Sequence, residues 1–181
     1  NLKGTCSVAE GCGNASSDKS YNGGKALIYG LEINSSYTPR IASVYFPLSA
    51  QYTLTRASFQ SHFTSTLSDW GIGEVHQGDP LPYVPRHQLG VQAGVRWQAI
   101  LANLQWKHQS ESYDQAIPLN REKLPSSAIL DVTSSYFADE HFEIYASMDN
   151  VTNQKNLVSL RPFGARPGKP QSYILGVKAS L

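Results

Sequence analysis

The C-terminal segment, residues 172–181, alternates strictly between two unlike faces, and this pattern constrains the fold more than any other feature. A period of two is typical of a β-strand whose faces meet different surroundings. A bare apolar strand at the end of a soluble protein leaves an edge that promotes aggregation, whereas a closed barrel pairs its last strand with its first. The segment therefore favours a barrel. One face carries Tyr173, Leu175, Val177, Ala179 and Leu181, and the other carries Ser172, Ile174, Gly176, Lys178 and Ser180.

The same alternation recurs upstream and predicts an all-β chain of about seven antiparallel strands without helices. The phase of the second strand slips at Arg56-Ala57, which predicts a β-bulge there. The predicted strands cover residues 25–37, 48–63, 87–97, 101–112, 128–136, 142–149 and 172–181.

The connections between these strands alternate in length, as in outer-membrane barrels with short periplasmic turns and long external loops. If the last strand runs toward the periplasm, residues 1–24 form an external loop and residues 25–181 a barrel segment. An odd strand number and an external N-terminus predict the C-terminal portion of a larger transmembrane β-barrel, with its earlier strands absent. The short connections are 40–47, 98–100 and 139–141, and the long ones are 64–86, 113–125 and 153–170.

The polar residues of the strands gather on one face, which in a wide barrel would line the lumen while the apolar face meets lipid. A secreted, soluble β-sandwich that binds glycans or protein, with its polar face solvated, is the alternative. Aromatic residues near strand ends fit the girdles of membrane barrels and also a sandwich core. The polar set is Gln88, Gln92, Arg96, Asn103, Gln105, Lys107, Asp131 and Glu143, and the aromatic set is Tyr37, Trp97, Trp106 and Tyr136.

Composition supports a surface of neutral polar and apolar side chains. Only 16% of residues are charged, 40% are apolar and the net charge is +1. The near-neutral charge and the lack of a basic stripe argue against a nucleic-acid partner. No apolar run is long enough for a membrane helix, which does not exclude a membrane barrel.

The last part of the chain resembles a known family. The segments Asp149-Asn150-Val151-Thr152-Asn153 and 161–170 (RPFGARPGKP), followed by the closing strand, resemble the end of TonB-dependent outer-membrane receptors of the ferric citrate and ferric siderophore type. The spacing of Gly176, Ala179 and Leu181 is similar to the C-terminal signal of outer-membrane proteins, which more often ends in Phe.

The resemblance implies a function and a set of partners. It implies a segment of a receptor in the bacterial outer membrane, in contact with lipid, that imports a ferric chelate. Energy would come from a TonB-type coupling protein that acts through the missing N-terminal plug. A passive small barrel or porin is the alternative within the membrane class.

The sequence contains no catalytic constellation, so we expect neither an enzyme nor a cofactor. The histidines show no paired ligand spacing, so no metal site is predicted. Arg161 and Arg166 lie in the last long connection with Lys169. Arginine forks suit the carboxylates of ferric citrate and many siderophores. These two arginines are therefore the candidate substrate-binding residues, and the alternative is that they brace the loop against its neighbours.

Cys6 and Cys12 are the only cysteines and lie in a segment rich in Gly, Ser and Asn. Two close cysteines in a loop indicate a small disulfide and an oxidising compartment. Two free thiols, or half of a metal site, are the alternatives, although a tetrahedral zinc site would need further ligands nearby.

Overall fold

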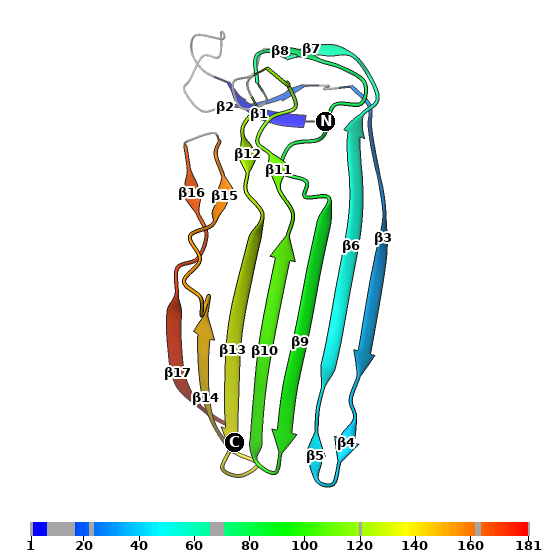
Figure 1. The fold of residues 1–181 in the computed structure, drawn as a ribbon. Helices are drawn as coiled ribbons and strands as arrows, with labels where there is room; N and C mark the ends of the chain where they lie inside the picture. Colours follow the sequence, from blue (N-terminus) through cyan, green and yellow to red (C-terminus); the bar gives the residue numbers. More distant parts are fainter. Residues whose placement is uncertain are drawn as a thin grey trace.

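The computed structural model describes residues 2–6, 17–21, 24–65, 71–119, 121–161 and 164–180. In this part of the chain seven long strands form one sheet, pairing antiparallel in the order β3-β6-β9-β10-β13-β14-β17 (Figure 1). Since strand order follows sequence order, the predicted meander is confirmed, and the β-sandwich alternative is wrong. The strands are β3 (Ala26–Tyr37), β6 (Leu48–Phe59), β9 (His87–Trp97), β10 (Ile100–Gln109), β13 (Ser127–Phe137), β14 (Phe142–Asp149) and β17 (Ser172–Ala179).

The short and long connections lie at opposite ends of this sheet, as the sequence predicts (Figure 1). The short end holds the small hairpin of β4 (Arg40–Ile41) and β5 (Val44–Tyr45), which extends the turn between β3 and β6. Each long connection contains a two-stranded hairpin of its own. These are β7 (Phe63–Ser65) with β8 (Gly73–Val75), β11 (Ser112–Tyr113) with β12 (Lys123–Leu124), and β15 (Leu157–Ser159) with β16 (Arg166–Pro167). No helix of the described residues is long and apolar enough to cross a membrane.

The N-terminal segment contains a hairpin rather than only irregular loop. Strand β1 (Leu2–Cys6) pairs antiparallel with β2 (Ser17–Tyr21). Cys12 lies outside the described residues, so the disulfide between Cys6 and Cys12 stays a prediction.

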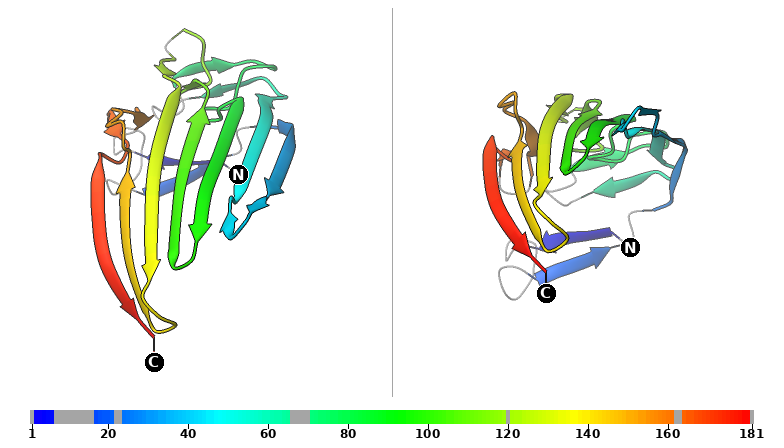
Figure 2. Two further views of the ribbon diagram at one scale, coloured as in Figure 1. Left: turned by 60° about the horizontal axis from the view of Figure 1, so that its bottom comes forward. Right: turned by 90° about the horizontal axis from the view of Figure 1, so that it is seen from below.

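Cross-strand register separates an apolar from a polar face across the whole sheet. Val91 of β9 pairs with Ala50 of β6 and Trp106 of β10, while Gln92 pairs with Ser49 and Gln105. The sheet is strongly curved, like part of a barrel wall (Figure 2). The polar face is the concave one, because a groove lined by Gln51, Gln88, Gln105, Lys107 and Asp131 opens on it. The apolar face is therefore convex, and register places all four predicted girdle aromatics on it.

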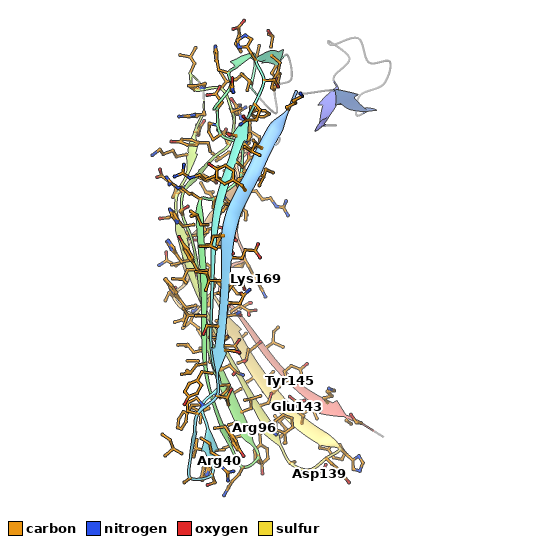
Figure 3. All side chains as sticks on the ribbon, turned by 90° about the vertical axis from the view of Figure 1, so that its right-hand side faces the viewer. Arg40, Arg96, Asp139, Glu143, Tyr145 and Lys169 are labelled. Carbon is orange, nitrogen blue, oxygen red and sulfur yellow. The ribbon has the colours of Figure 1, made fainter. Side chains whose placement is uncertain are left out.

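Glycine and aromatic residues complement each other near the end of the concave face. Tyr145 of β14 pairs with Gly176 of β17. The ring of Tyr145 lies across Gly176, so that a Cβ at this glycine would collide with it. Figure 3 labels Tyr145, with Glu143 on the same strand and Arg96 on β9. The glycine of the terminal strand is thus explained by the close approach of the tyrosine ring.

The predicted bulge at Arg56-Ala57 is wrong. Strands β3 and β6 keep one uninterrupted register from Ala26↔Phe59 to Tyr37↔Leu48. The apolar residues Ala57 and Phe59 belong to the concave face, which is covered by loops at this end of the strand. Phe59 is only 1% exposed there. The change in apolar phase therefore marks a strand that enters a buried core, not a change of register.

Because the two faces of β9 meet different surroundings, an arginine introduced at Val91 should change stability more than an arginine introduced at Gln92. We expect Val91→Arg to cost about 2–4 kcal/mol of stability in a bilayer, as arginine does on the lipid face of barrels near the midplane. Gln92→Arg, one residue along and facing the polar side, should cost little. The measurement is reversible unfolding of both variants in lipid vesicles, and equal costs would contradict the assignment of faces.

Candidate functional site

Polar side chains form a connected row across the concave face. Gln92, Gln105 and Asp131 are direct cross-strand neighbours on β9, β10 and β13. Lys107 Nζ donates a hydrogen bond to Asp131 Oδ2 at 3.1 Å. Lys107 and Asp131 thus satisfy each other, and the row presents amide and charged groups that an aqueous solute can contact.

A groove of about 680 Å³ lies on this face and continues up to the last long connection. Its floor is the sheet, with polar residues from β6, β9, β10 and β13. One wall comes from the last connection, through Asn156, Leu157, Val158, Gly168 and Lys169. The groove therefore joins the polar face of the barrel wall to the loop that carries the predicted arginines.

Asn150 holds the base of that loop. Its backbone N–H donates to Asp131 Oδ1 at 2.9 Å, and its Nδ2 donates to the carbonyls of Gln154 (2.9 Å) and Lys169 (3.1 Å). Its Oδ1 accepts from the Gln154 N–H at 2.9 Å. The side chain is 1% exposed and its φ is 51°, a conformation that asparagine tolerates better than most residues. The asparagine in the Asp149–Asn153 motif is thus a structural link between strand β13 and both arms of the loop.

Asp149 and Lys169 form a further contact between the two arms of this loop. The Asp149 carboxylate forms an ion pair with Lys169 Nζ. The Ser172 hydroxyl donates to Asp149 Oδ2 at 3.1 Å. Lys169, which the sequence grouped with the loop arginines, is therefore already paired with an acid of its own loop.

A small apolar core lies among the long connections. It brings the end of β6, the β7–β8 hairpin and the segment after β11 together, so two of the three long connections pack against each other. Gly71, with φ of 90°, lies so close to the Gln115 side chain that a Cβ would contact it. The core consists of Phe59, Val75, Ala116 and Ile117, with Phe63 and Leu81 partly buried against it.

Arg161 connects the third long connection to these two. Its Nε donates to Asp114 Oδ2 at 2.8 Å, and Asp114 is fully buried. The amide oxygen of Gln115, when it faces the guanidinium, accepts from Nη1 at 3.0 Å and Nη2 at 2.7 Å. The Arg161 backbone N–H also donates to the Tyr83 hydroxyl at 3.1 Å. The surroundings of Arg161 are those of a residue that braces loops.

Arg166 has different surroundings. It lies on β16 in a strand pair with Ser159, is exposed, and makes no side-chain hydrogen bond or ion pair with the described residues. By contrast Lys123, also in a loop, pairs with Glu111 at 2.8 Å, and that carboxylate raises the pKa of Lys123 above its ordinary value. The two arginines therefore share no hydrogen-bond or ion-pair partner among the described residues.

The sequence offered bracing of the loop as one role for Arg161, but it did not predict the residues that Arg161 contacts. Asp114 and Tyr83 lie in segments treated as irregular connections, and neither has a recognisable motif. The one available signal was the Asp149–Asn153 segment, whose asparagine-rich pattern is typical of turns with positive φ. Indeed both Asn150 and Asn153 have φ near 50°.

Comparisons with known proteins show which family and which solved structures this chain is similar to. A family model described as "TonB dependent receptor-like, beta-barrel" matches residues 4–151. The structure is similar to the ferric-catecholate import receptor Fiu from K12 E. coli in its closed form, with a TM-score of 0.65, 15% identity, and coverage of 91% of this chain and 22% of that one. It is also similar to the outer membrane transporter YddB from Escherichia coli, with a TM-score of 0.68, 14% identity, and coverage of 98% and 28%.

At such low identity the two structures show a shared fold alone, and this chain spans less than a third of either protein. None of the curated proteins compared with the sequence matches it.

Proposed function

This chain belongs to the TonB-dependent receptor-like β-barrel family and lies in the bacterial outer membrane, and on that premise we propose that it forms part of the barrel wall of a transporter that imports a ferric chelate. The chelate would be a ferric siderophore or ferric citrate, because the sequence of the last long connection resembles that of receptors for these ligands. The long connections, including residues 1–24, would face the cell exterior, as in other outer-membrane barrels.

The observation that supports this proposal most directly is the polar groove on the concave face. Its lining includes amide, hydroxyl and charged groups, and the last long connection bounds it. A ferric chelate with carboxylates is polar and anionic, so it needs such a surface along its route. The groove by itself would also serve a passive pore. Coupling to a TonB-type protein through an N-terminal plug must therefore be tested by asking whether uptake depends on the inner-membrane gradient.

Uptake by cells distinguishes the active transporter from the passive alternative. Cells that make the full-length protein should accumulate radioactive iron supplied as ferric citrate or as a ferric siderophore, and cells lacking its gene should not. A protonophore that collapses the inner-membrane gradient should abolish the accumulation. Iron entry that continues at the same rate after the protonophore would indicate a passive barrel and contradict the proposal.

Arg166 is the better substrate-binding candidate of the two loop arginines, because its guanidinium has no partner among the described residues. Arg166→Ala should weaken binding of a ferric carboxylate chelate roughly ten- to more than hundredfold, since a charge-assisted hydrogen bond contributes about 1.5–3 kcal/mol. The measurement is chelate binding by the full-length protein in detergent.

Lys155→Ala is the matched control, because it removes one exposed cation from the same connection. It should leave chelate affinity within about twofold, which corresponds to about 0.4 kcal/mol. Unchanged affinity in Arg166→Ala, or equal losses in both variants, would remove Arg166 from the binding site.

A further inference from the structure

The β7–β8 hairpin has two faces of opposite character. Its register pairs Phe63 with Val75 and Thr64 with Glu74. Phe63 and Val75 point into the apolar core among the loops. Because side chains alternate along each strand, the residues next to them belong to the other face. His62 immediately precedes β7 and His76 immediately follows β8, so these two histidines flank the hairpin on the face that carries Glu74.

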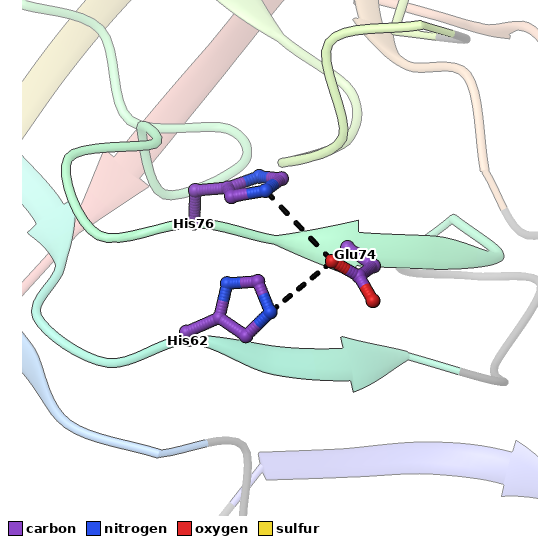
Figure 4. A group of neighbouring side chains, drawn as sticks. All are labelled: His62, Glu74 and His76. Carbon is purple, nitrogen blue, oxygen red and sulfur yellow. Dashed lines mark ion pairs between the residues drawn. The ribbon is translucent and has the colours of Figure 1, made fainter.

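The side chains of His62, Glu74 and His76 converge on that face (Figure 4). His62 Nε2 lies 3.1 Å from Glu74 Oε2, and His76 Nε2 lies 3.9 Å from the same oxygen. The two imidazole rings are 4.8 Å apart between centroids. One nitrogen from each histidine and one carboxylate oxygen thus point at a common position.

This arrangement has the dimensions of a metal site. Ligand atoms bound tetrahedrally to Zn²⁺ at about 2.0–2.1 Å are separated by about 3.3 Å. The three ligand atoms here already lie within 4.8 Å of one another. The two histidine-to-carboxylate distances, 3.1 and 3.9 Å, fall on either side of the separation expected around zinc. Small rotations of exposed side chains would bring them into place, and all three are more than half exposed.

A further acid stands behind one of the histidines. Asp79 Oδ2 lies 3.8 Å from His76 Nδ1, the ring nitrogen that does not face Glu74. The Asp79 carboxylate is itself fixed, because it accepts the His76 backbone N–H at 2.8 Å. A carboxylate at the second ring nitrogen is the usual support of a metal-bound histidine, because it sets the tautomer and the ring orientation.

We propose that His62, Glu74 and His76 form a Zn²⁺ site on the outer face of the β7–β8 hairpin, with Asp79 orienting His76. Two imidazoles and a carboxylate are ligands that zinc prefers, and three protein ligands leave a fourth position to water. The ion would link the residue that enters the hairpin to the residue that leaves it. The site lies on the face opposite the apolar core, so it requires no change in the packing of the loops.

The test is the binding of Zn²⁺ to the full-length protein, purified in detergent and freed of metal with a chelator. Isothermal titration should show one zinc ion fewer per molecule, or at least a hundredfold weaker binding at one site, in the double variant His62→Ala/His76→Ala. Glu74→Gln, which keeps a neutral oxygen in place, should weaken that site about tenfold. Co²⁺ in place of zinc should give the visible absorption of a tetrahedral site in the unmodified protein and lose it in the double variant.

His141→Ala is the matched control, because His141 is also exposed and also lies near a glutamate, with 3.6 Å from its Nε2 to Glu140 Oε1. It should leave zinc stoichiometry and affinity unchanged. Because the cluster side chains lie outside the apolar core, the variants should keep the far-ultraviolet spectrum of the parent protein. Zinc binding of equal stoichiometry and affinity in the parent and the double variant would overturn the proposal, as would an equal loss in His141→Ala.

Discussion

Replacing Asn150 with alanine should increase the hydrogen-exchange rate of the Val151 amide roughly a thousandfold. The substitution leaves the Gln154 N–H and the carbonyls of Gln154 and Lys169 without their partner. Each buried polar group left unpaired costs about 1–3 kcal/mol, and alanine in the left-handed region costs about 1–2 kcal/mol more. The lower ends of these ranges, for three polar groups and the backbone together, give about 4 kcal/mol, which corresponds to roughly three factors of ten. The Val151 amide is a suitable reporter, because its own bond to the Leu130 carbonyl is not removed by the change.

Two further variants separate the contributions to this effect. Asn153→Ala has the same positive φ but changes an exposed side chain, so it should show the backbone cost alone. Asn150→Gly relieves the backbone cost while still removing the hydrogen bonds, so it should fall between the other two. If Asn150→Ala accelerates exchange no more than Asn153→Ala does, the side-chain bonds of Asn150 contribute nothing to the loop.

The barrel wall could be predicted from sequence because each strand carries its own evidence. Alternation such as Leu89, Val91, Ala93 and Val95 against Gln88, Gln92 and Arg96 is local, and it survives without knowledge of the partner strand. The direction and order of strands then followed from connection lengths alone. The prediction failed where a strand left the simple pattern, at Ala57 and Phe59, because their burial depends on loops that arrive from elsewhere in the chain.

The loop cluster could not be predicted in the same way. Asp114 and Arg161 are 47 residues apart, and nothing local indicates that they pair. The pairing arises only because long connections of adjacent hairpins meet at one end of the sheet. A buried acid in an irregular segment has no periodic pattern around it, so its partner can be named only from the folded structure.

The proximity of His62 and His76 could not be predicted from the sequence either. His62 and His76 have no ligand spacing typical of a helix or a short motif, and the sequence therefore predicted no metal site. Their proximity depends on the register of the β7–β8 hairpin, which lies inside a segment that was treated as one long loop. A hairpin whose strands are three residues long gives too few alternations to be recognised from sequence.

Replacing Arg161 with alanine should destabilise the packing of the three long connections by about 3 kcal/mol, near the lower end of the range for breaking a buried ion pair. The acid that loses its partner, Asp114, is fully buried, whereas Arg161 is about one-third exposed, so water can screen part of the pair. Among the described residues, the Asp114 carboxylate then keeps only the hydrogen bond from the Glu122 N–H, at 2.6 Å. Proteolysis of the long connections under native conditions should consequently become about a hundredfold faster, since each 1.4 kcal/mol is a factor of ten.

A double-mutant cycle shows whether the ion pair itself is the cause. Asp114→Asn removes the buried charge, so Arg161→Ala introduced into that background should cost less than it does in the parent protein, with a coupling of about 1–3 kcal/mol. Arg166→Ala is the matched control: it removes an arginine of the same connection that has no side-chain partner among the described residues, and it should leave the proteolysis rate unchanged. Additive effects in the cycle would mean that the Arg161 side chain acts through its contact with Gln115 rather than through Asp114. An Arg161→Ala protein that resists protease as well as Arg166→Ala does, yet binds ferric chelate weakly, would instead assign Arg161 to the substrate and not to the bracing of the loops.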